Sequence, residues 1–247
     1  MRVIPFMVGL LLTLPIFALA QLPEGLKARD LHKDVMLRTS EGKIIIRLSD
    51  ATPLHRNNFL RLAKQHYYEG ILFHRVIKNF MIQAGDPQSK NAVPGKALGD
   101  SGAAYKIPAE IRPDFFHHKG VVAAARMGDN VNPERWSSGS HFYIVQGRIH
   151  TDVSLDSVER FRLEGRKIPS DRRAYYKTIG GSPHLDQSYT IFGYVVKGLE
   201  VIDRIANNAT SKGVDRDRPL KDIKILKSKL IRRRKYTLEQ FPYPSGM

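Results

Sequence analysis

The sequence of 247 residues contains no cysteine, and its 24 acidic residues are far outnumbered by 40 Lys and Arg. The lack of cysteine excludes disulfides and cysteine-based metal sites, and it argues against a lipid-anchored form. The shortage of acid leaves a formal net charge of +16, which suits nucleic acid or another acidic surface as a partner. Composition therefore admits a basic adhesion or scaffold protein that works through its charge.

The N-terminal apolar run is short for a membrane-spanning helix, which needs about 20 apolar residues. Residues 1–20 instead fit a signal peptide, because Arg2 supplies a positive start, an apolar core follows, and the Ala-Leu-Ala triplet ending at Ala20 fits the small-x-small cleavage rule. We expect a mature chain beginning at Gln21 that is exported to the periplasm or secreted by a bacterium. The rival interpretation is an uncleaved anchor. An exported protein rarely meets nucleic acid, so we expect no nucleic-acid partner and, after cleavage, no membrane span.

The remaining chain has the length of one domain with additions. Composition divides it into a polar linker, a folded domain, an insertion within that domain and a basic, aromatic tail that we expect to be poorly ordered. The predicted boundaries are 21–33 for the linker, 34–231 for the domain, about 147–181 for the insertion and 232–247 for the tail.

Local patterns predict a β-hairpin over residues 34–48 and a helix over 52–67. Thr52 is the candidate N-cap of that helix, and Pro53 fits its first position. A last strand is predicted within residues 219–231.

The insertion is predicted to hold two short helices, one after Asp156 and one capped by Ser170. It re-enters the chain close to a candidate site, so it either forms a rim of a substrate groove or is a decoration of the surface. His117 and His118 form a tempting metal pair, but adjacent residues of a strand point to opposite faces and no third ligand is obvious. We therefore expect no metal.

The most informative stretch is 73–86, which reads FHRVIKNFMIQAGD. If residues 73–77 and 80–84 are two strands, alternation places Phe73, Arg75 and Ile77 on one face. A buried guanidinium or carboxamide is costly unless it is hydrogen-bonded or faces a ligand. The stretch therefore predicts either a small site for a neutral, partly apolar ligand with carbonyl groups, or a plain hairpin with one snorkelling arginine.

The same stretch closely resembles the signature of the cyclophilin family of peptidyl-prolyl isomerases, roughly FHR-x₄-FM-x-QGGD, with Ala84 in place of a glycine. Residues 120–127 resemble the family strand GxLSMAN, 138–144 resemble GSQFFI, and 183–196 resemble WLDGxHxxFGxV. The resemblance covers roughly residues 34–146 and 183–228.

The resemblance implies a mainly β fold: a closed eight-stranded antiparallel barrel with a helix over each end, here carrying the helical insertion. It implies isomerisation of X–Pro bonds in exported proteins without a cofactor, by a monomer whose partners are proline-containing polypeptides. Arg75 is implied as the catalytic donor, with Gln83 bonding the substrate backbone. The implied substrate-binding residues are Phe80, Met81, Gln83, Ala125, Arg126, Tyr143, Leu185 and Tyr189.

Several of these positions depart from the family pattern. Arg126 replaces an Asn, Tyr143 a Phe, His141 a Gln, His184 a Trp or Phe, and Tyr189 a His. None of the departures removes Arg75. The alternative from another class is a chaperone module that holds proline-containing segments with little turnover.

Overall fold

The computed structural model describes residues 24–234. The predicted signal peptide and residues 235–247 of the predicted tail lie outside the described residues. Within 24–234, no helix is both long and apolar enough to cross a membrane. The helices and strands are β1 Lys33–Thr39, β2 Gly42–Leu48, α1 Pro53–Lys64, β3 Phe73–Ile77, β4 Met81–Ala84, β5 Lys106–Ile107, β6 Val121–Ala124, β7 Ser137–Ser138, β8 Phe142–Val145, α2 Asp152–Arg162, α3 Ser170–Thr178, β9 Ile191–Lys197, α4 Leu199–Ala206 and β10 Ile225–Arg232.

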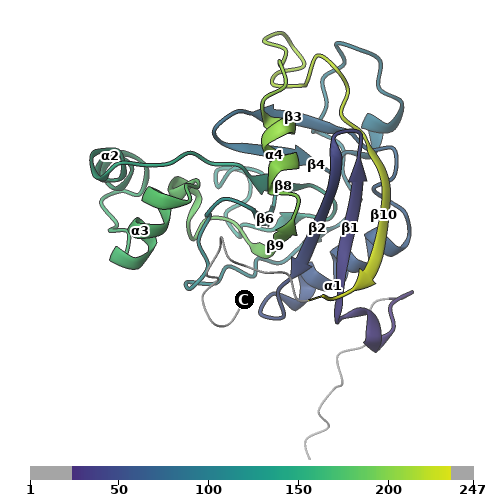
Figure 1. Ribbon diagram of the computed structural model, residues 1–247, viewed down its shortest axis with the longest axis horizontal. Coiled ribbons are helices and arrows are strands. Elements are labelled where there is room, and N and C mark those ends of the chain that lie inside the picture. The colour runs from purple at the N-terminus through teal and green to yellow at the C-terminus, as the bar shows by residue number, and fades with distance from the viewer. Residues whose placement is uncertain (1–23, 235–247) are drawn as a thin grey trace, which may run out of the picture.

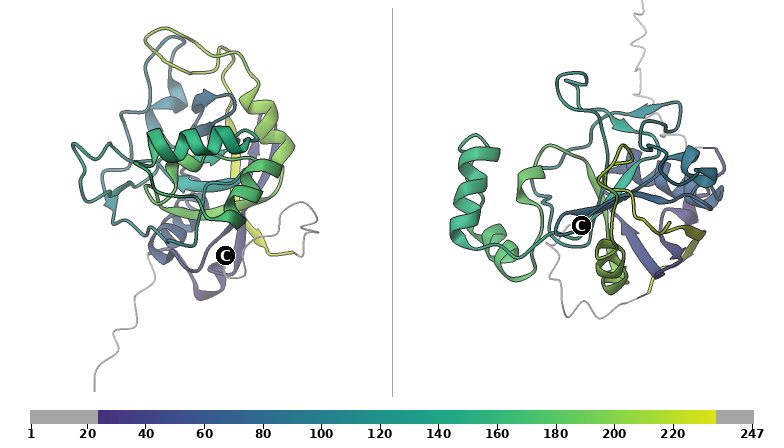
Figure 2. Two further views of the ribbon diagram at one scale, coloured as in Figure 1. Left: turned by 90° about the vertical axis from the view of Figure 1, so that its left-hand side faces the viewer. Right: turned by 90° about the horizontal axis from the view of Figure 1, so that it is seen from above.

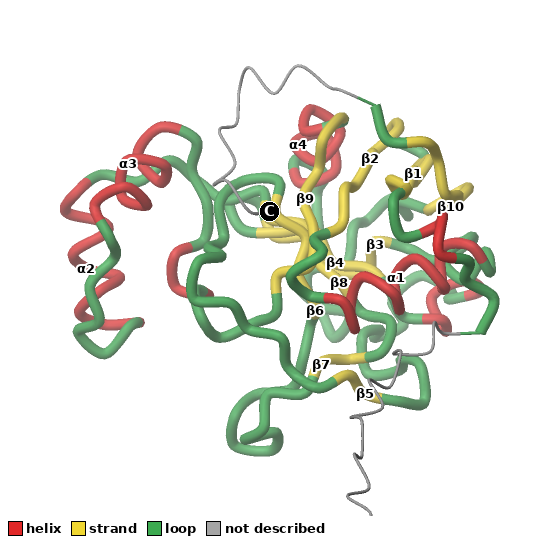
Figure 3. Tube along the Cα trace, turned by 90° about the horizontal axis from the view of Figure 1, so that it is seen from below, coloured by secondary structure: helices red, strands yellow, loops and turns green. Residues whose placement is uncertain are grey.

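Eight strands form one antiparallel sheet in the order β10-β1-β2-β9-β6-β8-β4-β3, which curves around a hydrophobic interior (Figure 1). Strands β5 and β7 pair separately and lie apart from the main sheet (Figure 3). Helices α1 and α4 pack into the interior, as Phe59 and Ile202 illustrate by their burial in the same cluster. The predicted mainly β fold and the hairpin over 34–48 are thus confirmed.

The prediction of a closed barrel is wrong, because the sheet is an open half-barrel that ends at β3 and β10. These two strands form no continuous ladder. The chain before them meets in an isolated bridge between Leu72 and Lys224, and a loop lies along the rest of β3. From that loop the Asp217 carbonyl accepts a hydrogen bond from the Val76 N–H at 2.8 Å. A loop satisfies this edge where a closed barrel would need a strand.

The start of α1 is fixed by a distant residue. Pro53 occupies the first position as predicted, but the side chain of Thr52 makes no capping hydrogen bond. The carboxylate of Glu110 accepts hydrogen bonds instead from the N–H groups of Leu54 and His55, at 3.0 and 2.9 Å. The negative charge of this carboxylate also interacts favourably with the positive end of the helix dipole. Thr52 thus stands at the N-cap position as predicted, but the capping hydrogen bonds are accepted by the Glu110 side chain.

Residues 24–32, within the predicted linker, contact the half-barrel. Leu26 packs at the edge of the core, and Asp30 is buried. Two ammonium groups lie at the Asp30 carboxylate, Lys33 at 2.8 Å and Lys64 at 2.6 Å. Burial raises the pKa of Asp30, but the hydrogen bonds from these lysines outweigh it and hold that pKa well below its usual range.

The segment that carries α2 and α3 projects to one side of the half-barrel (Figures 1 and 2). It leaves at Gly147 and returns at Gly181, and the two backbones pass so closely that a Cβ on Gly147 would lie 2.4 Å from the Gly181 Cα. Helix α2 begins at Asp152, after a capping box formed by Thr151 and Ser154. The predicted start after Asp156 is thus wrong by one turn. Helix α3 is present, but Ser170 is its first residue and Pro169 stands at the N-cap position without a side-chain cap, so the predicted capping role of Ser170 is wrong.

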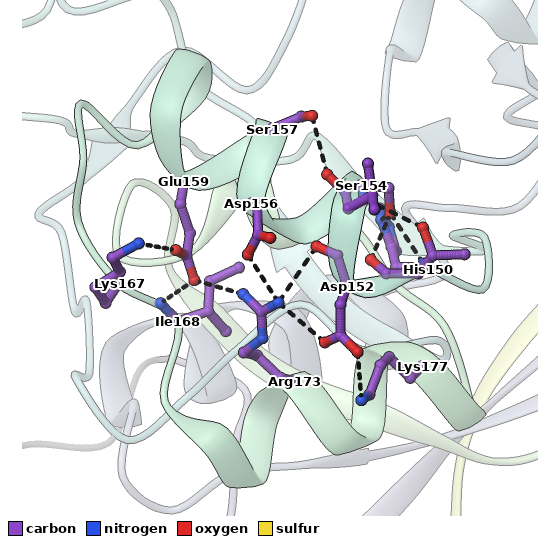
Figure 4. A network of polar contacts seen from close by, with 12 residues as sticks. His150, Asp152, Ser154, Asp156, Ser157, Glu159, Lys167, Ile168, Arg173 and Lys177 are labelled. Carbon is purple, nitrogen blue, oxygen red and sulfur yellow. Dashed lines mark hydrogen bonds and ion pairs between the residues drawn. The ribbon is translucent and has the colours of Figure 1, made fainter.

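One arginine of α3 holds the acidic side of α2 (Figure 4). The guanidinium of Arg173 contacts the carboxylates of Asp152, Asp156 and Glu159 at 3.0, 2.9 and 2.8 Å. Glu159 is buried and also accepts the Ile168 N–H at 3.0 Å. Burial raises the pKa of Glu159, but these donors and an exposed lysine lower it overall. The two helices are therefore joined by charge as well as by their small apolar cluster.

Replacing Arg173 with Met should loosen α2 against α3, because the buried Glu159 carboxylate loses its guanidinium partner. We expect faster amide hydrogen exchange across residues 152–178, with exchange in β1 and β2 unchanged. Arg160→Met is the matched control. It makes the same substitution within α2, but the Arg160 guanidinium lies over the ring of Phe161 and not on a carboxylate of the helix pair. Equal acceleration in both variants, or acceleration spread through the whole sheet, would show that Arg173 does not hold the pair.

Candidate active site

A β-bulge in β3 aims Arg75 outward. Phe73 pairs with Ala84 and Arg75 pairs with Gln83, so β3 holds one extra residue, His74, between the two pairs. Phe73 consequently packs in the interior cluster. The prediction that Phe73 and Arg75 share a face is therefore wrong, because the bulge breaks the alternation on which it rests.

The register continues the row of site residues across the sheet. Gln83 of β4 lies between Arg75 of β3 and Tyr143 of β8, and Tyr143 pairs with Ala123 of β6. Ala84 lies within β4, so this replacement of a family glycine sits in an extended strand, where a side chain causes no backbone strain.

All nine predicted site residues line one pocket of about 170 Å³ on the outer face of the half-barrel. Strands β3, β4 and β8 supply its centre, and the segment after α3 supplies its far wall. The lining residues are Arg75, Phe80, Met81, Gln83, Ala125, Arg126, Tyr143, Leu185 and Tyr189. The apolar members pack together as a cluster separate from the interior core. Such a space fits a small, largely apolar group with two polar groups at its edge.

Arg75 is the polar group with the most freedom. Its side chain is 43% exposed, and its Nε lies 3.7 Å from the carboxylate of Asp217. The structure records no other hydrogen bond or ion pair of the Arg75 guanidinium within residues 24–234. Because Asp217 restrains the guanidinium through Nε, the terminal nitrogens remain available to a ligand.

Arg126, in contrast, is already engaged. Its Nε donates to the carbonyl of Ser188 at 2.8 Å, its Nη1 contacts the Asp129 carboxylate at 2.5 Å, and its guanidinium stacks over the Tyr189 ring at 4.6 Å. The side chain is 4% exposed. Arg126 therefore fastens the wall that Tyr189 forms and has little capacity left for a substrate.

A buried hydrogen-bond chain lies behind the pocket and connects it to α3. The Tyr143 hydroxyl lies 3.0 Å from His117 Nε2, and His117 Nδ1 lies 3.0 Å from a carboxylate oxygen of Asp186. The other carboxylate oxygen accepts from the Tyr176 hydroxyl at 2.7 Å. Since a carboxylate only accepts, we assign the His117 proton to Nδ1, so that Nε2 accepts from Tyr143. The Tyr143 hydroxyl thus turns away from the pocket.

Two histidines beside the pocket, His184 and His74, are neutral near pH 7. His184 packs its ring on Phe80 with centroids 5.2 Å apart, and burial, with the charge of Arg162, lowers the pKa of His184 to about 4. His74 is buried in the bulge, and burial lowers its pKa to about 3. The pocket therefore carries its positive charge on arginine alone.

Sequence reasoning missed the supporting residues Asp217, His117, Asp186 and Tyr176. His117 was noted only as half of a metal pair, whereas its ring is held by Asp186 and Tyr143. Within residues 24–234 no group of three potential metal ligands occurs. Asp186 follows Leu185 in the stretch that resembles the family motif, and that adjacency was the only available signal.

Comparison with known proteins identifies the family of this arrangement. The model of the family described as cyclophilin type peptidyl-prolyl cis-trans isomerase/CLD matches residues 34–230. The chain is 33% identical over 192 residues to a protein of Staphylococcus aureus named as a peptidyl-prolyl cis-trans isomerase, covering 77% of this chain and 88% of that protein. A bifunctional phosphatase/peptidyl-prolyl cis-trans isomerase of Streptococcus pyogenes is 34% identical over 76% of this chain, which spans 37% of that longer protein.

Solved structures resemble the fold. A cyclophilin-type peptidyl-prolyl cis-trans isomerase of Cryptosporidium parvum superposes with a TM-score of 0.57 and 22% identity, covering 82% of this chain and 99% of that one. The same protein solved in the presence of the dipeptide Ala-Pro gives a TM-score of 0.54, with 79% and 96% covered.

Asp186→Ala should lower the free energy of unfolding by on the order of 3 kcal/mol, because the buried donors of His117 and Tyr176 lose their acceptor. Tyr143→Phe removes one hydroxyl from the same chain and should cost about 1 kcal/mol. Urea unfolding of both variants measures this. Equal, small losses would show that Asp186 does not organise the chain.

Proposed function

This chain belongs to the cyclophilin-type peptidyl-prolyl cis-trans isomerases, and we propose that Arg75 is the donor through which it accelerates rotation about X–Pro bonds. The observation that carries the proposal is the position of Arg75. It stands opposite Gln83 at the edge of an apolar pocket, with its Nε 3.7 Å from the Asp217 carboxylate.

The reaction needs a donor rather than a nucleophile or a base. Amide resonance imposes a rotation barrier of about 18–20 kcal/mol on the X–Pro bond. Rotation breaks that resonance and leaves a lone pair on the prolyl nitrogen. A guanidinium N–H aimed at this nitrogen stabilises the twisted state and not the planar ones, which is the requirement for lowering a barrier. Arginine suits the task because its charge persists at physiological pH.

The remaining pocket residues would hold the substrate in the required orientation. Met81, Tyr143 and Leu185 are buried and apolar at the pocket surface, with Phe80 at the rim, and would enclose the proline ring. Gln83 would bond a backbone carbonyl or N–H of the substrate beside it. This assignment supports proline-containing polypeptides as the partners, as does the Ala-Pro dipeptide used with the Cryptosporidium protein. Since one chain supplies all nine residues, we propose that the monomer is active, and sedimentation at assay concentration tests this.

Arg75→Ala should reduce kcat/KM for an Ala-Pro test peptide by about 10²–10³-fold, the range seen when one preorganised donor is removed. The melting temperature should remain nearly unchanged, because the Arg75 side chain is 43% exposed. A protease-coupled isomerisation assay and a thermal melt provide the two readouts.

Arg38→Ala is the matched control, because it removes one exposed positive charge from β1, across the sheet from the pocket. Its activity should equal that of the unaltered protein. Parallel loss of activity and thermal stability in Arg75→Ala would contradict a catalytic role. A folded protein that turns over no peptide in any form would favour the proline-binding chaperone module instead.

We also propose that the protein acts on exported clients after removal of residues 1–20, as the N-terminal pattern supports. Intact-mass analysis of the protein recovered from the bacterial envelope or medium should find a chain that begins at Gln21. Recovery of the full-length chain from the membrane fraction would instead establish the uncleaved anchor.

A further inference from the structure

A second, larger cleft adjoins the proposed proline pocket. It has a volume of about 650 Å³ and lies between α2 and the half-barrel. Phe80 lines both the cleft and the proline pocket, and His184, which stacks on Phe80, lies on the cleft side. A polypeptide held by its proline would therefore enter this cleft with one of its two flanks.

Helix α2 separates its charges between two faces. Asp152, Asp156 and Glu159 face α3, where Arg173 holds all three (Figure 4). The cleft side of the helix presents a different set, spaced at three and four residues along one face. These residues are Ser154, Ser157, Val158, Phe161 and Arg162. The acidic groups of α2 are thus neutralised away from the cleft.

The cleft carries uncompensated positive charge. Arg148 and Arg162 line it, and neither has a carboxylate within 4 Å among residues 24–234. None of the described residues that line the cleft is acidic. These charges act on the histidines that line the cleft. Burial lowers the pKa of His184 and of His150, and the charge of Arg162 lowers the first further and that of Arg148 the second. Both histidines are consequently neutral near pH 7.

The opposite flank of the proline pocket differs. A cleft of about 390 Å³ shares Gln83, Ala125 and Arg126 with the pocket. Arg126 is already paired with Asp129, and the other charged residues of the lining, Asp100 and Lys106, are of opposite sign. Of these two clefts, only the one beside α2 is lined by positive charge without an acidic residue.

We propose that the α2 cleft is a subsite that selects acidic residues on one flank of the isomerised proline, through Arg148 and Arg162. The proposal rests on the isomerase function and adds a client preference to it. Phe161, which is 70% exposed, supplies an apolar surface beside the two arginines. Polypeptides with Asp or Glu two or three residues from the proline are the predicted ligands.

The test compares three peptides in a protease-free NMR exchange assay: one neutral Ala-Pro peptide, one with two Glu residues before the Ala-Pro unit and one with two Glu residues after it. For the unaltered protein we expect kcat/KM to be about fivefold higher for one of the acidic peptides than for the neutral peptide. This is the gain expected from two exposed ion pairs between peptide and protein. The preference should shrink as salt is added.

Arg162→Gln should remove most of this preference and leave turnover of the neutral peptide unchanged. Arg160→Gln is the matched control, because it removes the same charge from the same helix but lies outside the cleft lining. It should keep the preference. Equal loss in both variants would show that overall charge attracts the peptide and would overturn the subsite.

Two further outcomes separate this proposal from the function on which it rests. Turnover of all three peptides at the same rate would overturn the proposed subsite for acidic residues and leave the isomerase assignment intact. Absence of turnover for every peptide, in a folded protein, would overturn the proposed function itself. Binding of the acidic peptide that survives Arg148→Gln/Arg162→Gln would also contradict the subsite.

Discussion

The extra residue in β3 is the constraint on which the site depends. A strict strand would place residues 73 and 75 on one face, so that Phe73 and Arg75 would compete for the same environment. The bulge at His74 lets Phe73 fill the interior while Arg75 reaches the outer pocket. Burial lowers the pKa of His74, so its ring is neutral near pH 7. The bulge therefore contains no unpaired buried charge at this residue. The signature FHR therefore describes a core residue, a bulge and a cation that lines the outer pocket.

The outer pocket is supported from behind by polar groups rather than by apolar packing alone. The Tyr143 hydroxyl, His117 and Asp186 form a buried chain that ends on Tyr176 of α3. Each member satisfies its neighbour, which makes such a network rigid and sensitive to single losses. The same hydrogen-bond chain consequently holds both Tyr143 in the pocket wall and Tyr176 in the projecting helix α3. The charged clamp of Arg173 then fixes α2, so that the cleft beside the pocket keeps a defined shape.

Short sequence patterns predicted the elements whose formation depends on residues close together in the chain. The hairpin, the first helix with Pro53 at its start, and the strands that bring Arg75 opposite Gln83 all follow from patterns within a few residues. The resemblance to a family then located the rest of the pocket, which short motifs far apart in the chain supply. Some of the errors are local, because the bulge at His74 and the capping box before Asp152 each involve neighbouring residues. Others concern partners distant in sequence. Glu110 caps α1, and a loop rather than a strand lies along β3, which leaves the sheet open.

The most direct measurement of the central claim is a crystal structure of the mature chain with an X–Pro peptide bound. The account predicts the proline ring among Met81, Tyr143 and Leu185, with a terminal nitrogen of Arg75 within hydrogen-bonding distance of the prolyl nitrogen. A proline seated elsewhere, or an Arg75 that remains on Asp217 and faces away from the peptide, would contradict it.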